Sequence, residues 1–83
     1  MNHVVFWFPE ADKTLQTLIL DAADRDACLL WIREIDFWLA RGPLDFGESR
    51  YDTIRLGVVA RLAVLFEVLD DPPTVIVLDI WRF

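Results

Sequence analysis

The apolar residues of this 83-residue chain change their spacing after Pro43, and this change limits the folds that the chain can adopt. Before Pro43, apolar side chains recur every three or four residues, which is the spacing of a helix face. After it they alternate, which is the spacing of a strand. Helices followed by consecutive strands favour an α+β arrangement. We therefore predict a single domain over residues 1–83, with helices on one face of a largely antiparallel sheet.

Start and stop signals divide the first half into a strand and two helices. Val4–Phe8 is rich in Val, Phe and Trp, which predicts a strand, and Pro9 suits the first position of the helix that follows. Asp24 is the predicted N-cap of the second helix, which ends at Gly42 before Pro43. The apolar stripe of this second helix comprises Cys28, Trp31, Ile32, Ile35, Trp38 and Leu39.

The second half predicts a loop and three strands joined by tight connections. The loop runs from residue 43 to 52, and the strands cover residues 53–59, 61–69 and 74–81. Alternation is clearest in the middle strand, where one face carries Leu62, Val64, Phe66 and Val68.

The order of these elements resembles the RelE/ParE superfamily of small bacterial toxins from type II toxin–antitoxin pairs. Three stretches carry the likeness: the first strand with FPEADKTL, then WLARGPLDFGESR, and finally RLAVLFEVLDDPPTVIVLDIWR. They are similar to the family's opening strand and helix, to its connector after the second helix, and to its central hairpin. The likeness covers nearly the whole chain and rests on the order and spacing of these stretches.

The resemblance implies a toxin-like bacterial protein that acts on translation or on another cellular target. RelE-like members cleave messenger RNA on the ribosome without a metal, ParE-like members act on DNA gyrase, and a small antitoxin neutralises both. Metal-free cleavage requires cations beside the phosphate and a proton donor. The family pattern assigns these cations to Arg55, Arg61 and Arg82, which are the predicted catalytic residues.

Two departures from the family pattern leave the activity open between a metal-independent endoribonuclease and a non-catalytic interaction module. Ala63, three residues before Phe66, stands where the family has an arginine, and the family's C-terminal tyrosine has no counterpart beyond Phe83. The alternative role for the three arginines is structural, in cross-strand pairs with Glu67 and Asp79.

Other reactive residues are weaker candidates. Tyr51 is either a proton donor or a packing residue, His3 is expected to be a surface residue, and Cys28 is expected to be a buried thiol. One cysteine and one histidine provide neither a disulfide nor a structural zinc site, so we expect no metal and no cofactor.

The apolar content of 55% exceeds what a small domain is expected to hide, and contiguous exposed apolar patches mark partner surfaces. Leu30 and Phe37 form a second stripe on the second helix. Together with Trp38 and Trp81 they are the predicted partner surface, for an antitoxin or for a second copy of the chain.

The net charge and the length of the apolar runs further limit the functions that we expect of this chain. The net charge is −6, which weighs against nonspecific nucleic-acid binding. The acidity is concentrated in the helical half, because residues 50–83 hold five acidic and four basic residues, so the net charge is compatible with an anionic target at the sheet. Apolar runs are too short to span a membrane, and no basic segment typical of a signal peptide precedes Pro9, so a cytoplasmic protein is expected.

Overall fold

The computed structural model describes residues 2–83 and contains a five-stranded sheet with helices packed against it. In chain order the elements are β1 (Val4–Trp7), α1 (Pro9–Asp21), α2 (Arg25–Arg41), α3 (Pro43–Phe46), β2 (Glu48–Tyr51), β3 (Ile54–Val59), β4 (Leu62–Asp70) and β5 (Pro73–Arg82). A strand, a helical hairpin and then antiparallel strands confirm the predicted α+β fold class.

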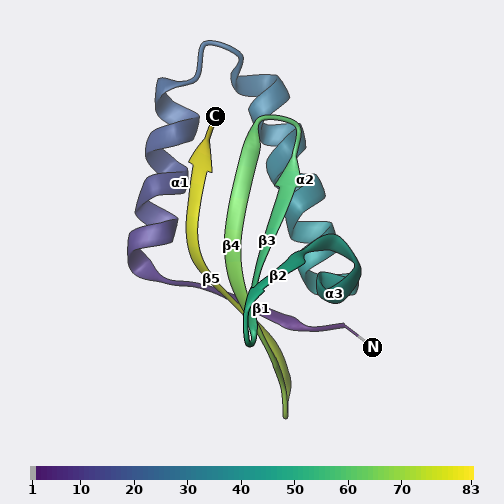
Figure 1. The fold of residues 1–83 in the computed structure, drawn as a ribbon. Helices are drawn as coiled ribbons and strands as arrows, with labels where there is room; N and C mark the ends of the chain where they lie inside the picture. Colours follow the sequence, from purple (N-terminus) through teal and green to yellow (C-terminus); the bar gives the residue numbers. More distant parts are fainter. Residues whose placement is uncertain (1) are drawn as a thin grey trace.

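The strands are arranged in the order β1-β5-β4-β3-β2, with β1 parallel to β5 and all other neighbours antiparallel. The helices carry the chain from β1, at one edge of the sheet, to β2, at the opposite edge. In Figure 1 the sheet lies in front of α1 and α2, so both long helices cover the same face. Within residues 2–83, no helix has the length and apolar character needed to cross a membrane.

The core fills the space between the long helices and the sheet. The predicted face of β4 is confirmed, because Leu62, Val64, Phe66 and Val68 are all buried. On α2, the buried part of the predicted stripe comprises Cys28, Ile32, Ile35 and Leu39. The two tryptophans of that stripe lie at its margin, where Trp31 is half-buried and Trp38 remains 37% exposed.

The prediction of a loop over residues 43–52 is wrong, because this segment contains α3 and β2. The aromatic ring of Phe46 on α3 stacks between Trp38 and Phe66, with ring centroids 6.4 and 6.0 Å away. Gly57 makes room for this stack, since a Cβ at that position would collide with the Phe46 ring. Contacts distant in the sequence therefore hold a segment that has no clear periodicity of its own.

Candidate functional site

The face of the sheet opposite the long helices carries side chains that meet in three cross-strand rows. The pairing register gives one row of Val58, Ala63 and Trp81, a second of Glu48, Leu56, Leu65 and Asp79, and a third of Tyr51, Ile54, Glu67, Ile76 and Phe6. We call the twelve residues of these rows the open face. Because this is the face that the helices leave uncovered, it is the surface on which a catalytic or binding site would lie.

Arg55 lies on the other side of the sheet. It pairs with Phe66, whose side chain is fully buried in the core beneath the helices. The Arg55 guanidinium donates hydrogen bonds to two main-chain carbonyls, from Nε to Gly47 and from Nη2 to Leu44, both at 3.1 Å. Arg55 therefore fastens β3 to the end of α3.

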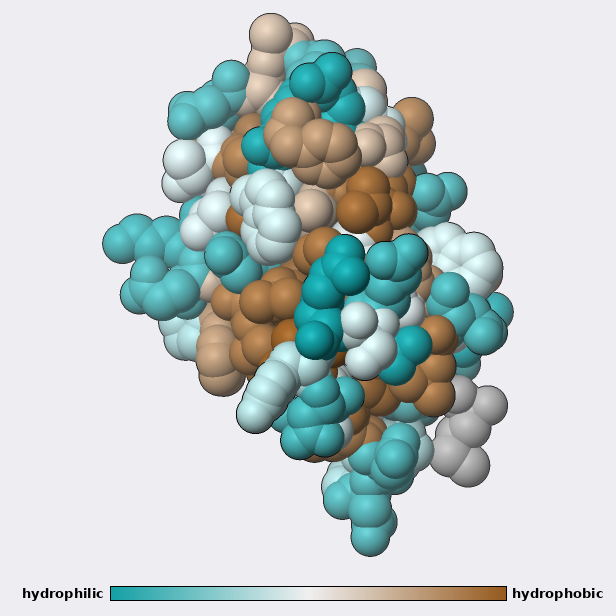
Figure 2. Space-filling model, in the orientation of Figure 1, coloured by the Kyte–Doolittle hydropathy of each residue, from teal (hydrophilic) through white to brown (hydrophobic). Residues whose placement is uncertain are grey.

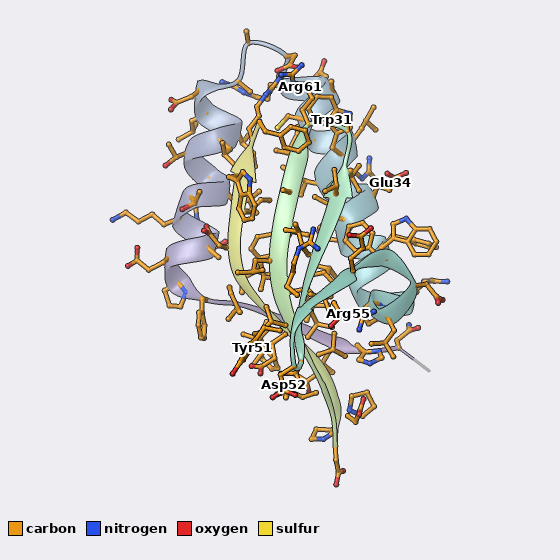
Figure 3. All side chains as sticks on the ribbon, viewed as in Figure 1. Trp31, Glu34, Tyr51, Asp52, Arg55 and Arg61 are labelled. Carbon is orange, nitrogen blue, oxygen red and sulfur yellow. The ribbon has the colours of Figure 1, made fainter. Side chains whose placement is uncertain are left out.

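Arg61 lies in the tight connection between β3 and β4. Its Nε donates to the Phe83 carbonyl oxygen at 2.8 Å, and the Phe83 amide donates back to the Arg61 carbonyl oxygen at 3.0 Å. Figure 3 shows Arg61 and Arg55 at opposite ends of β3. Arg61 thus secures the C-terminal end of the chain against the hairpin.

Arg82 is paired with Leu62, a core residue, and its guanidinium reaches the turn between α1 and α2. Its Nη1 and Nη2 donate to the two carboxylate oxygens of Asp24 at 2.8 and 2.9 Å. The guanidinium also lies 5.3 Å from the centre of the Trp31 ring. Because of this hydrogen-bonded pair, the pKa of Asp24 is lowered and the pKa of Arg82 is raised.

The Asp24–Arg82 pair corrects the predicted capping role of Asp24. Asp24 does occupy the N-cap position of α2, but its side chain makes no capping hydrogen bond. A shallow hollow of about 340 Å³ lies beside the pair and is lined by Leu18, Asp21, Ala22, Ala23, Asp24 and Arg82. This hollow lies at the α1–α2 turn, on the helix side of the molecule.

The structure therefore does not bring the three predicted catalytic arginines together. Each guanidinium is bound to an acceptor of its own chain, and Arg55 and Arg82 lie on the side of the sheet that faces the helices. The alternative pairing with Glu67 and Asp79 is wrong as well. Glu67 accepts a hydrogen bond from Thr53 Oγ1 at 2.6 Å, and Asp79 accepts one from the amide of Ile80 at 2.8 Å.

The open face is apolar and acidic. Its charged residues are Glu48, Glu67 and Asp79, and several of its apolar side chains remain accessible, with Val58 50% and Phe6 58% exposed. Figure 2, in the orientation of Figure 1, shows brown apolar atoms over the sheet, interrupted by teal polar atoms near the centre. At the adjoining sheet edge, Arg50 of β2 forms a salt bridge of 3.5 Å with Glu48 of the same strand.

The weaker candidates do not assemble a second reactive centre. Tyr51 is 71% exposed at the end of β2, so it is not the packing residue of the alternative assignment. Cys28 is fully buried, which confirms the predicted buried thiol. The His3 amide donates to the Ala40 carbonyl oxygen at 2.7 Å, and the Nδ1 of its partly buried ring has no partner within residues 2–83. Among those residues, no three potential metal ligands come together.

The four residues of the predicted partner surface occupy two separate places. Leu30 and Phe37 are 63% and 49% exposed on α2, on the side of the helix turned away from its buried stripe. Trp38, between them and the core, packs edge-on against Phe37 at 5.6 Å. Trp81 belongs to the open face, on the far side of the sheet from α2.

Comparison with known proteins places the fold. No family model and no curated protein matches the sequence. The structure, however, aligns with a chain in the crystal structure of the toxin–antitoxin complex RelBE2 from Mycobacterium tuberculosis, with a TM-score of 0.82, 18% identity and complete coverage of both chains. The chain has a RelE-like toxin fold. At 18% identity the likeness establishes the fold alone, so the activity has to be inferred from the side chains of this chain.

Apart from Trp81 and the weaker candidate Tyr51, the residues of the open face were not predicted from the sequence as a site, although the sequence carried a signal for it. In β4, Leu62–Leu69 is apolar at every position except Glu67, so both faces of the strand are apolar. Such runs are typical of strands that are covered on both sides. The helices of this RelE-like fold cover one side, which leaves the other available to a partner.

Proposed function

We propose that this chain is a toxin–antitoxin-type protein that acts by binding a protein partner, and that it does not cleave RNA with Arg55, Arg61 and Arg82. The observation that carries the proposal is the makeup of the open face, which is apolar with three carboxylates, while the arginines are engaged elsewhere. The full-length fold match to a chain of a toxin–antitoxin complex supports the first part of the proposal.

The chemistry of RNA cleavage supports the second part. A pentavalent phosphate gains negative charge in the transition state, and fixed cations must stabilise that charge. The charged residues of the open face are Glu48, Glu67 and Asp79, all of them acidic. Near a protein surface, a like charge about 4 Å away costs about 4 kcal/mol, so these carboxylates oppose the reaction.

The exposed apolar area supports protein binding, in place of RNA cleavage, as the activity of this chain. Besides the open face, α2 exposes Leu30 and Phe37 on its outer side. Contiguous apolar surface on a small chain is characteristic of partner interfaces, because water contact with such surface is unfavourable. An antitoxin-type partner is the class of protein that the fold match favours.

The decisive experiment combines partner binding with an activity assay. The chain is co-expressed with the product of the adjacent short open reading frame, and the pair is purified by a tag on one member. We expect a stable complex, and we expect overexpression of the chain alone to slow bacterial growth. If there is neither a complex nor an effect on growth, the toxin–antitoxin assignment is wrong.

Activity on RNA and on gyrase is measured with the same purified chain. In a reconstituted translation reaction, we expect messenger RNA to remain intact. Cleavage that is lost in Arg61→Ala while the fold is retained would overturn the non-catalytic part of the proposal. A gyrase supercoiling assay tests the ParE-like alternative.

A further inference from the structure

We propose that the open face is a docking surface for an amphipathic segment of a different protein, with apolar residues toward the sheet and lysine or arginine residues beside them. The proposal rests on the protein-binding function above and adds both the surface and the chemistry of the partner. It concerns the three cross-strand rows, and the exposed stripe of α2 has no part in it.

The first argument is the apolar character of a sheet face that has no cover. Antiparallel sheets usually present polar side chains on the face that meets water. Here the rows place Val58 beside Ala63 and Trp81, and Leu56 beside Leu65, with Val58 50% and Trp81 38% exposed. A partner that removes these side chains from water gains the corresponding hydrophobic free energy.

The second argument is size. Strands lie about 4.8 Å apart, so five strands span about 19 Å, and a helix with its side chains is about 10 Å wide. One helix therefore fits across the open face with room for flanking side chains.

The third argument is the charge embedded in the apolar rows. Within the described residues, Glu67 accepts its hydrogen bond from Thr53, and Asp79 accepts one from the adjacent amide of Ile80. A carboxylate has about four lone-pair sites, so both groups retain capacity for further donors. Lysine or arginine side chains form short, charge-assisted hydrogen bonds with such groups.

The same charges decide against a second copy of the chain as the occupant. Two open faces pressed together would bring the Glu67 and Asp79 carboxylates of both copies into one interface, and each chain carries a net charge of −6. Juxtaposed like charges destabilise an interface, whereas complementary charges steer the partner and fix its orientation. The occupant is therefore a cationic segment from a different chain.

The test uses the full chain and two labelled peptides of about 15 residues, a length that allows a helix to form. One peptide has leucines along one helical face and lysines elsewhere, and the other has glutamate in place of every lysine. Fluorescence anisotropy should show binding of the lysine peptide, with affinity that falls as salt is added, and no binding of the glutamate peptide. Equal binding of both peptides would contradict the proposed role of the carboxylates.

Matched variants locate the binding surface. Glu67→Gln combined with Asp79→Asn, which leaves one oxygen acceptor in each side chain and removes its charge, should weaken lysine-peptide binding about tenfold. Glu34→Gln on α2, which Figure 3 shows away from the open face, should change it less than about twofold. If all of these variants bind alike, the peptide is attracted only by the net charge and the proposal is wrong.

Apolar variants complete the test. Trp81→Ala and Val58→Ser should each weaken binding about tenfold, while Leu30→Ser on α2 should leave it unchanged. Denaturation of each variant checks that it folds. If Trp81→Ala does not fold, Val58→Ser alone tests the apolar contribution to binding. Light scattering that shows a dimer which Val58→Ser dissociates would assign the face to a second copy and overturn the proposal.

Binding of the adjacent gene's product distinguishes a failure of the docking surface from a failure of the proposed function. If the product of the adjacent gene binds the wild-type chain and the open-face variants equally well, the proposed function stands and the docking surface is wrong. If that product does not bind at all while the lysine peptide binds through the open face, the toxin–antitoxin pairing is wrong and the docking chemistry stands.

Discussion

Arg55 distinguishes a structural from a catalytic use of the sheet arginines, because its two hydrogen bonds predict a measurable loss of stability. In Arg55→Ala, the carbonyls of Leu44 and Gly47 lose a charged donor. A hydrogen bond contributes about 1 kcal/mol net, and one with a charged partner contributes more, but Arg55 is partly exposed. We therefore expect the free energy of unfolding to fall by about 2 kcal/mol.

Urea denaturation followed by tryptophan fluorescence measures this loss. With an m-value of about 1–2 kcal/mol per molar urea, the midpoint should fall by about 1–2 M. Arg55→Lys retains the charge but not the planar fork, and about half of the loss should remain. Arg33→Ala on the exposed surface of α2 is the control, and its effect should stay within about 0.5 kcal/mol. If Arg55→Ala is as stable as wild type, the structural role assigned to this side chain is wrong.

Three further changes test the packing and the ion pair. Gly57→Ala places a Cβ against the Phe46 ring, and calorimetry should show a loss of about 1–3 kcal/mol. Ala60→Gly should raise the free energy of unfolding by about 0.5–1 kcal/mol in urea titrations, because Ala60 has a left-handed φ of 52°. The pKa of Asp24 is lowered from 3.8 by the hydrogen bond from Arg82, so this carboxylate stabilises the fold above that pH. The stability advantage of wild type over Asp24→Asn should accordingly shrink as the pH falls below 3.8, which denaturation at a series of pH values measures.

The sequence was sufficient to predict a helix or strand where a periodic pattern extends over several helical turns or strand pairs. The buried stripe of α2 recurs at Cys28, Ile32, Ile35 and Leu39, and Gly42 ends the helix. By contrast, α3 and β2 are four residues each, which is about one helical turn and two strand periods. Patterns this short are ambiguous, so only the tertiary stack around Phe46 determines their structure.

The faces of β3 explain why Arg55 lies away from the open face. Three of its apolar residues, Ile54, Leu56 and Val58, lie on the open face, while Arg55, Gly57 and the buried Val59 face the helices. The usual expectation is the reverse, with apolar residues against the core. Phe46 fills the space above Gly57, and the carbonyls at the end of α3 receive Arg55. Neither contact is visible in the order of residues.

These contacts also mean that RNA cleavage by the three arginines would compete with the fold for the same side chains. Arg55 joins β3 to α3, Arg61 holds Phe83, and Arg82 joins β5 to Asp24 at the α1–α2 turn. Turning any of these guanidinium groups toward a phosphate would leave its present acceptor without a donor and would forfeit part of the stability that the bond contributes. A net stability of about 5–15 kcal/mol leaves little room for three such losses. A protein partner, which needs only the apolar and acidic open face, requires none of them to move.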